Sequence, residues 1–290
     1  MNKKNLHDKL GKTPLVIAEV GQNHQGSLKI AKEYIREFSK SGADIIKFQA
    51  RDNKRLFSKE AYNKIYDSEN SFGKTYGQHR EKLELSFSDL KELKKECKKK
   101  NLLFMVTPFD ESSLKLVSKL NVDIIKIASF DLGNLPFINL ISKEKKAVAI
   151  SIGGGNSKEI EQSINLLQKK NIKIILLHCV SEYPCPYNHL GLENIKLLKK
   201  KFPKCIIGLS DHFNGILSGP IAYLQGARVF EKHVTLNRAW KGTDHSFALE
   251  PEGFRKFTRD IHRVGQMLKP KKQELIGKEP VFVKLGKSLI

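Results

Sequence analysis

Two lysines interrupt apolar stretches of this sequence in nearly the same way. Lys47 lies in "ADIIKFQ" and Lys126 lies in "DIIKIAS", so each charge stands where an apolar residue is expected. A lysine in such a place is costly unless it meets an opposite charge. We therefore predict that the two lysines bind a shared anion, a phosphate or a carboxylate, with an internal ion pair to Glu19 or Glu231 as the alternative.

Three serines supply neutral donors that suit the same anion. Ser129, Ser151 and Ser210 each close an apolar stretch, and Ser151 is followed by the glycine-rich turn 153–155. A single serine in such a position would be interpreted as a helix cap. Three of them beside two lysines favour an anion site to which hydroxyl and backbone N–H groups donate hydrogen bonds.

Two histidines point to a divalent metal ion. His212 follows the apolar stretch "CIIGLS", and His233 closes "RVFEKH". On neighbouring strands the two imidazoles would converge and leave positions open for water and a substrate oxygen. A lone histidine here is more commonly an ordinary hydrogen-bonding residue, but Asp244 and His245 follow in the next loop. The donors suit Mn²⁺, Mg²⁺ or Zn²⁺, and we predict that the segment 230–251 meets a substrate.

The elements that carry these residues must end at one edge of the fold. Apolar, β-branched stretches alternate with segments of helical period along the whole chain. The predicted strands are 15–19, 44–48, 102–107, 123–129, 147–151, 173–179, 205–210 and 228–233. The predicted helices are 28–42, 87–101, 113–121, 157–171 and 192–202. Eight such units in about 270 residues predict an α/β fold, the (β/α)₈ TIM barrel, whose active site lies at the carboxyl ends of the strands. A doubly wound open sheet is the alternative.

Composition favours a single globular domain. The chain of 290 residues is 40% hydrophobic and 29% charged, without a low-complexity tract. We assign residues 1–270 to the barrel and residues 271–290 to a C-terminal linker segment. The connection 50–85 is longer than a barrel needs, and we predict that it carries a functional loop.

The basic charge does not by itself indicate a nucleic-acid partner. The 52 Lys and Arg against 31 Asp and Glu give a net charge of +21, but much of the excess lies in "KELKKECKKK" and "LLKKKFPK", which fit exposed helix faces. The four cysteines have no zinc spacing, which favours buried reduced thiols. A secretory leader and an apolar run of membrane-spanning length are both missing. We expect a cytoplasmic protein with no nucleic-acid or membrane partner.

Six motifs resemble the sialic acid synthase family, which makes nonulosonic acids from phosphoenolpyruvate. They are "IAEVGQNHQGSL", "ADIIKFQ", "DIIKIAS", "HCVSEYPCPY", "GLSDHFNGI" and "EKHVTLNRAWKGTDHSFALEP". The motifs occur in family order, and the similarity runs from about Thr13 to Ser288. The resemblance implies the TIM barrel, a divalent metal and a carbon–carbon bond-forming transferase.

The resemblance also implies a role for each matching residue. The metal ligands match His212 and His233, with Mn²⁺ as the expected ion and Mg²⁺ or another divalent ion as alternatives. The phosphoenolpyruvate-binding groups match Lys47, Thr107, Lys126, Ser129, Ser151 and Ser210. The groups that contact or orient the acceptor sugar and the reacting centre match Glu19, Gln49, Tyr183 and Asp244. The residues expected to be catalytic are Glu19, Lys47, Lys126, His212 and His233.

The implied reaction joins phosphoenolpyruvate to the open-chain form of an N-acetylmannosamine-type aldose, either free or as its 6-phosphate. Carbon 3 of the donor attacks the metal-polarised aldehyde, carbon 2 takes up water, and the tetrahedral intermediate expels phosphate by C–O cleavage. Glu19 is the candidate that orients or deprotonates this water. The stretches "NSFGKTYGQHREKLE" and "WKGTDHS" resemble the branch with a 6-phosphorylated acceptor. Legionaminate, pseudaminate and 3-deoxy-ulosonate synthases are the alternatives.

Two departures from the family pattern bear on acceptor binding. The family usually has Thr-Gly-Met after the residue that matches Ser151, whereas this sequence has Ile152 and three glycines. Family members also continue past an "LGKSL"-like linker into an antifreeze-like domain that supplies an arginine to the partner subunit's acceptor site, whereas this sequence ends at Ile290. We expect an open acceptor pocket and a weakened homodimer. A barrel-only subunit that needs a partner chain is the alternative.

Overall fold

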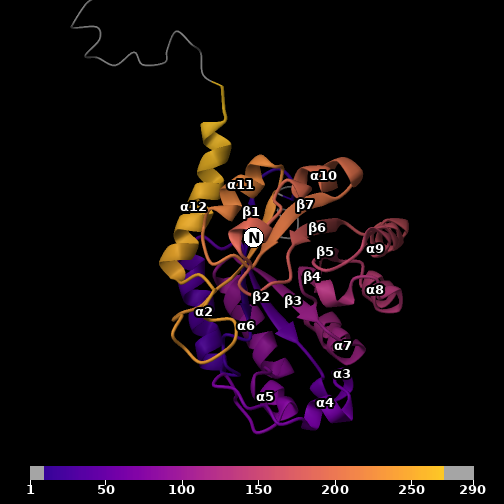
Figure 1. Ribbon diagram of the computed structural model, residues 1–290, viewed down its shortest axis with the longest axis vertical. Coiled ribbons are helices and arrows are strands. Elements are labelled where there is room, and N and C mark those ends of the chain that lie inside the picture. Colours follow the sequence, from indigo (N-terminus) through magenta and orange to yellow (C-terminus); the bar gives the residue numbers. More distant parts are fainter. Residues whose placement is uncertain (1–9, 271–290) are drawn as a thin grey trace, which may run out of the picture.

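Eight parallel strands pair in sequence order and close into a barrel (Figure 1). The computed structural model describes residues 10–270. The strands are β1 (Leu15–Gly21), β2 (Ile45–Ala50), β3 (Leu103–Pro108), β4 (Ile124–Ile127), β5 (Ala147–Ser151), β6 (Ile174–Cys179), β7 (Ile206–Asp211) and β8 (Val229–His233). The predicted TIM barrel is confirmed, and an open sheet is excluded because β1 pairs with both β2 and β8. The linker predicted at 271–290 lies outside the described residues.

Helices surround the barrel, as Figure 1 shows. The five predicted helices are present as α2 (Leu28–Lys40), α6 (Phe87–Lys99), α7 (Glu111–Leu120), α9 (Ser157–Lys169) and α10 (Asn194–Lys201). Helices that periodicity did not predict are α3 (Asn53–Leu56), α4 (Lys59–Asn63), α5 (Tyr76–Lys82), α8 (Leu135–Ser142), α11 (Ser218–Leu224) and α12 (Pro251–Met267). Short 3₁₀ turns occur at Ser129–Asp131 and Tyr187–His189. The long connection 50–85 therefore contains three short helices.

Local sequence signals set the ends of the predicted helices. Ser86 and Asn156 form reciprocal capping boxes at the starts of α6 and α9, where each side chain accepts from a backbone N–H that the helix leaves unpaired. At the end of α7, Asn121 adopts the left-handed conformation with φ of 51°. Asparagine tolerates this conformation better than most residues, so it stops the helix at the expected place.

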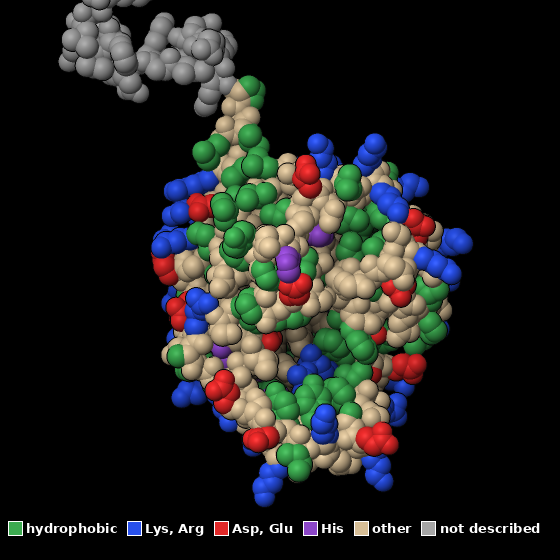
Figure 2. All heavy atoms as spheres, viewed as in Figure 1, with side chains coloured by type: hydrophobic (Ala, Val, Ile, Leu, Met, Phe, Trp, Pro, Cys, Tyr) green, Lys and Arg blue, Asp and Glu red, His purple; other side chains and the backbone are tan. Residues whose placement is uncertain are grey.

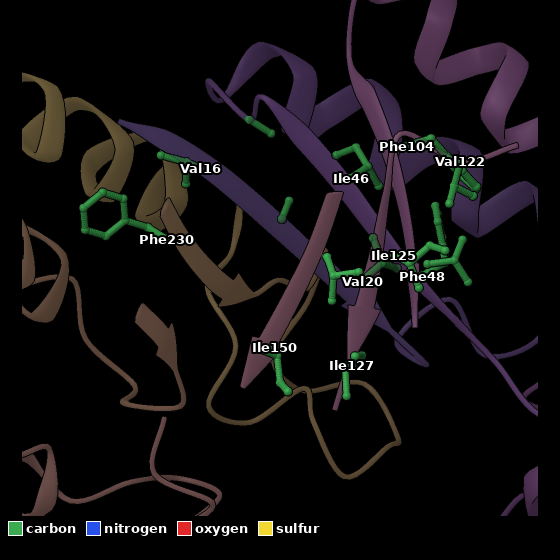
Figure 3. Packing of buried hydrophobic residues seen from close by; sticks show 14 of the residues in the cluster. Val16, Val20, Ile46, Phe48, Phe104, Val122, Ile125, Ile127, Ile150 and Phe230 are labelled. Carbon is green, nitrogen blue, oxygen red and sulfur yellow. The ribbon is translucent and has the colours of Figure 1, made fainter. Parts of the chain in front are cut away.

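Two apolar layers hold the barrel. Outward-facing strand residues pack against the helices, as Figure 3 shows for Val16, Ile46, Phe104 and Ile125 among others. A second cluster fills the barrel interior with Leu15, Ile17, Ile45, Leu103, Met105, Ile124, Ala147, Ala149, Ile175, Leu177 and Val229. Side chains alternate along a strand, so the next inward positions towards the carboxyl ends carry the polar residues. The fold thus places an apolar plug beneath a polar cavity.

The face of the molecule seen in Figure 2 carries its charge in dispersed form. On the face in Figure 2, Lys and Arg side chains are scattered around the outline, with Asp and Glu among them. The same face is hollowed near its middle, where further basic side chains lie. Within residues 10–270 no helix combines the length and the apolar composition needed to cross a bilayer.

Candidate active site

One cavity of about 640 Å³ collects the twelve residues that the sequence assigned to the site, whereas His245 lies outside its lining, against Thr235. Its lining includes Glu19, Lys47, Gln49, Thr107, Lys126, Ser129, Ser151, Tyr183, Ser210, His212, His233 and Asp244. They come from all eight strands and the loops that follow them, because parallel strands in a barrel end at one face. Their convergence is a property of the structure, whereas their roles stay predictions.

The two lysines form buried ion pairs at the base of this cavity. Lys47 Nζ lies 3.3 Å from Glu19 Oε2 and 3.0 Å from Glu231 Oε1. Lys126 Nζ lies 3.4 Å from Glu231 Oε1, and Ser210 Oγ donates to the same oxygen at 3.1 Å. The internal ion pair that the sequence left as an alternative is therefore present. Anion binding by the lysines stays a prediction.

Burial and neighbouring charges separate the two carboxylates. Burial raises the pKa of Glu19, and Lys47 offsets this only in part. Burial also opposes ionisation of Glu231, but Lys126 and Lys47 together lower its pKa below the ordinary value. Burial lowers the pKa of Lys126, while for Lys47 the two carboxylates outweigh burial and raise it. Lys47 and Lys126 thus share Glu231, whose pKa is lowered, and Lys47 also pairs with Glu19, whose pKa is raised.

Hydroxyl and backbone donors line the wall beside the lysines. Ser129 Oγ accepts from the N–H of Gly153 at 3.0 Å, which ties β4 to the turn after β5. A Cβ at Gly153 would lie 2.4 Å from Ser181 Oγ, so only glycine lets the turn approach this closely. Ser151 Oγ is buried and has no hydrogen-bond partner among residues 10–270. An unpaired buried hydroxyl is costly and is therefore typical of a ligand-binding wall.

Glu19, Gln49 and Asp244 converge around one glycine. Gln49 Nε2 donates to Glu19 Oε1 at 2.6 Å. A Cβ at Gly21 would lie 3.4 Å from Glu19 Oε1, 3.5 Å from Gln49 Nε2 and 3.6 Å from Asp244 Oδ2. Gly21 has φ of 57°, a conformation that glycine adopts without strain. The loop after β8 is thereby placed against the ends of β1 and β2, next to the carboxylate whose pKa is raised.

The two histidines fit an open divalent-metal site. Their ring centroids lie 5.4 Å apart, and His212 Nδ1 hydrogen-bonds to the carbonyl of Val180 at 2.7 Å, which leaves Nε2 with its lone pair. His233 Nδ1 is buried without a hydrogen-bond partner in the described chain and lies 3.6 Å from Asp244 Oδ2. Burial lowers the pKa of His233, which favours the neutral, ligating form.

The described residues alone offer no complete coordination shell. Among residues 10–270 no group of three or more His, Cys, Asp or Glu is placed to hold a metal. His212 and His233 would therefore be two ligands of the implied ion, and water and substrate oxygens would supply the rest. Tyr183 packs on His212 with ring centroids 4.0 Å apart, and Phe247 lies 5.2 Å from the ring of His233. These contacts fix the planes of both imidazoles.

Several residues of the cavity were not among the predicted site residues. Glu231 was weighed only as an ion-pair partner, yet it contacts both lysines. Cys179 lines the cavity as a free thiol, and the alternation of side chains along β6 would have indicated this position. Arg51 continues the two-residue spacing of the inward positions just beyond β2, so a longer strand prediction would have found it. Arg80 comes from α5 in the long connection, where no periodic signal exists.

Comparison with known proteins gives one consistent result. The model of the NeuB family matches residues 34–273. N-acetylneuraminate-9-phosphate synthase of Mus musculus is 36% identical, over 97% of this chain and 79% of the relative. N,N'-diacetyllegionaminic acid synthase of Campylobacter jejuni is 39% identical, over 87% of this chain and 77% of the relative.

Solved structures agree with the family match. The crystal structure of N-acetylneuraminic acid synthetase from Leptospira borgpetersenii in complex with citrate is 31% identical, with a TM-score of 0.80 over 95% of this chain and 92% of that one. A truncated 3-deoxy-D-arabino-heptulosonate 7-phosphate synthase from Thermotoga maritima shares 16% identity and a TM-score of 0.67, over 88% of each chain. At that identity only the fold is comparable.

Proposed function

Because this chain belongs to the NeuB family of phosphoenolpyruvate-condensing nonulosonic acid synthases, we propose that it joins phosphoenolpyruvate to an N-acetylmannosamine-type aldose. The products are a sialic acid or a related nonulosonic acid and inorganic phosphate. Relatives at 36% and 39% identity are named for different products, so the family match alone leaves the acceptor open. The observation that carries the proposal is the meeting of twelve separate polar residues in one cavity.

The part of the cavity that carries Lys47 and Lys126 binds the donor. Lys47 and Lys126 attract the phosphate and carboxylate of phosphoenolpyruvate, and the unpaired hydroxyl of Ser151 donates to one of its oxygens. The N–H of Gly153 donates to Ser129 Oγ and so holds this serine on the same wall. These contacts hold the donor with carbon 3 towards the histidines, and fixed orientation lowers the entropic cost of the carbon–carbon bond.

The acceptor meets the part of the cavity that His212, His233, Asp244 and Gln49 line. A divalent metal held by His212 and His233 would polarise the aldehyde and stabilise the alkoxide that forms there. Asp244 and Gln49 contact the hydroxyls of the open-chain sugar, and Gln49 also holds Glu19 in place through the 2.6 Å hydrogen bond. With donor and acceptor bound side by side in one cavity, the two reacting carbons come together.

Glu19 acts as the base that accepts a proton from the attacking water. After carbon 3 of phosphoenolpyruvate bonds to the aldehyde carbon, carbon 2 is electron-poor and takes up water. Glu19 receives the proton of this water, which suits a carboxylate whose pKa is raised by burial. The tetrahedral intermediate then breaks its C–O bond, and the bridging oxygen leaves with phosphate. The hydroxyl left at carbon 2 loses its proton to the departing phosphate and becomes the ketone, while the alkoxide of the former aldehyde takes up the proton that Glu19 received.

Acceptor-dependent release of phosphate tests the proposal. The purified chain is incubated with Mn²⁺, phosphoenolpyruvate and either N-acetylmannosamine or its 6-phosphate. We expect phosphate release only when an acceptor is present, and donor labelled with oxygen-18 in its bridging position should pass the label to phosphate. The double variant His212→Ala, His233→Ala should lose this release. His262→Ala, an exposed histidine on α12, is the matched control and should keep it.

Two results would argue against the proposal. Label that stays in the organic product would exclude C–O cleavage. Phosphate release that survives the double variant would remove the two histidines from the reaction. Intact donor binding by calorimetry without any turnover would instead favour the subunit that needs a partner chain.

A further inference from the structure

Two arginines line the cavity apart from the two lysines. Arg51 follows β2 directly, and Arg80 belongs to α5 in the connection 50–85. Burial, and then the positive charge of Arg80, lower the pKa of Arg51 to about 10. Both side chains line the same cavity, and that of Arg51 is only 7% exposed. Two positive charges that line one cavity attract a ligand of opposite charge.

Arg51 is held in a fixed orientation. Its Nη1 lies 3.3 Å from Glu84 Oε1, its Nη2 donates to Gln49 Oε1, and its guanidinium stands 4.0 Å from the centre of the Phe109 ring. Gln49 in turn donates to Glu19 Oε1 at 2.6 Å. Arg51 is thus joined to the reacting centre through a single side chain, and its planar donor group is preorganised.

Arg80 has donors that the described part of the chain does not use. No carboxylate among residues 10–270 forms an ion pair with Arg80, and its buried Nε has no hydrogen-bond partner there. The guanidinium carbon of Arg80 stands 5.9 Å from the centre of the Tyr76 ring. Glu84 is the carboxylate paired with Arg51, so only one of the two guanidinium groups has a carboxylate partner among the described residues. The pair keeps a positive charge and a free buried N–H for a ligand.

We propose that Arg51 and Arg80 form an anion subsite for the phosphate of an acceptor that is phosphorylated at the end remote from its aldehyde. This inference rests on the proposed function, which puts the aldehyde next to His212 and His233. A phosphate suits two guanidinium groups, because its oxygens can accept parallel N–H bonds from both. The donor's anionic groups are already assigned to Lys47 and Lys126. The arginine pair therefore sets acceptor specificity.

The ratio of kcat/KM for N-acetylmannosamine 6-phosphate to that for N-acetylmannosamine tests the subsite. We expect the native chain to prefer the phosphorylated acceptor by at least about 10-fold. Arg80→Ala should lower the ratio roughly 10- to 100-fold, mainly through KM, as expected for lost charge-assisted hydrogen bonds. Arg80→Lys should restore part of it. The control is Arg55→Ala on α3, an exposed arginine 3.6 Å from Asp52, which should leave the ratio unchanged.

Three outcomes would overturn the inference: equal use of the two acceptors by the native chain, an unchanged acceptor ratio in Arg80→Ala, or a raised KM for phosphoenolpyruvate in that variant with no change in acceptor preference. A melting curve of Arg80→Ala checks that it folds.

If neither acceptor is turned over, calorimetry separates the two proposals. Tighter binding of the 6-phosphate than of the free sugar, lost in Arg80→Ala, would support the subsite while the proposed reaction fails. Equal binding of both sugars would reject the subsite as well.

Discussion

Replacing Lys232 with methionine should lower the free energy of unfolding by about 3–5 kcal/mol, because it would strand a buried carboxylate. Lys232 Nζ donates to Asp211 Oδ2 at 2.6 Å, and the two side chains are 1% and 0% exposed. The pair lies between the barrel and the helices and joins β7 to β8, behind the two histidines. Asp211 would keep its bonds from Phe213 N at 3.0 Å and Ser218 Oγ at 2.5 Å, so the loss should stay within this range.

The lower free energy of unfolding should be measurable as a lower melting temperature. An unfolding entropy of about 2.1 cal/mol/K per residue gives about 0.6 kcal/mol/K for a chain of this length. Lys232→Met should therefore lower Tm by about 5–8 °C in a calorimetric scan. Adding Asp211→Asn should recover part of the loss, since no charge then stays buried.

A matched exposed pair provides the control. Arg255 Nη2 lies 2.7 Å from Glu252 Oε1 on the surface of α12, and solvent screens this pair. Arg255→Ala should leave Tm unchanged. A shift below about 2 °C for Lys232→Met, or a double variant less stable than the single one, would refute the argument that desolvation makes the buried pair costly to break.

Three further changes test the barrel and its site. Gly208→Ala should cost about 1–3 kcal/mol by urea unfolding, because its Cβ would lie 2.3 Å from the carbonyl oxygen of Val229, and an unchanged midpoint would show that β8 can shift. A chelator should abolish turnover and added Mn²⁺ should restore it, whereas full activity after chelation would contradict a metal role for His212 and His233. Burial raises the pKa of Asp131 to about 6 from 3.8, so its ionisation destabilises the fold as pH rises from about 4 to 6. Asp131→Asn should flatten this fall in Tm, and an unchanged pH profile would show that Asp131 ionises normally.

Local pattern predicted most of the secondary structure. The β-branched apolar stretches became the eight strands, with differences of one or two residues at their ends. β4 stops at Ile127, because Ser129 begins a 3₁₀ turn rather than continuing the strand. The sequence of α12 also indicates a helix, because Pro251 lies in its first turn and Phe254, Phe257 and Ile261 lie on one buried face.

The weaker elements could not be predicted in the same way. α11 reads "SGPIAYL", in which glycine and proline oppose a helical interpretation, yet Gly219 lies against Phe257 and Ile261 of α12. Only glycine leaves room there, since a Cβ would come within 2.5 Å of the Phe257 ring. The helix therefore forms through tertiary packing, which overrides its low intrinsic propensity.

The sequence by itself determined which residues face the inside of the barrel, because alternation along a strand and a common strand direction follow from local pattern. It therefore predicted that Lys47, Lys126 and Glu231 would meet at one end. Only the tertiary structure decided their pairing, since the closeness of groups on different strands depends on barrel closure and on the stagger between strands. It also decided that Arg80, from an aperiodic connection, lines the same cavity as Arg51. That placement depends on long-range packing, which no spacing along the chain encodes.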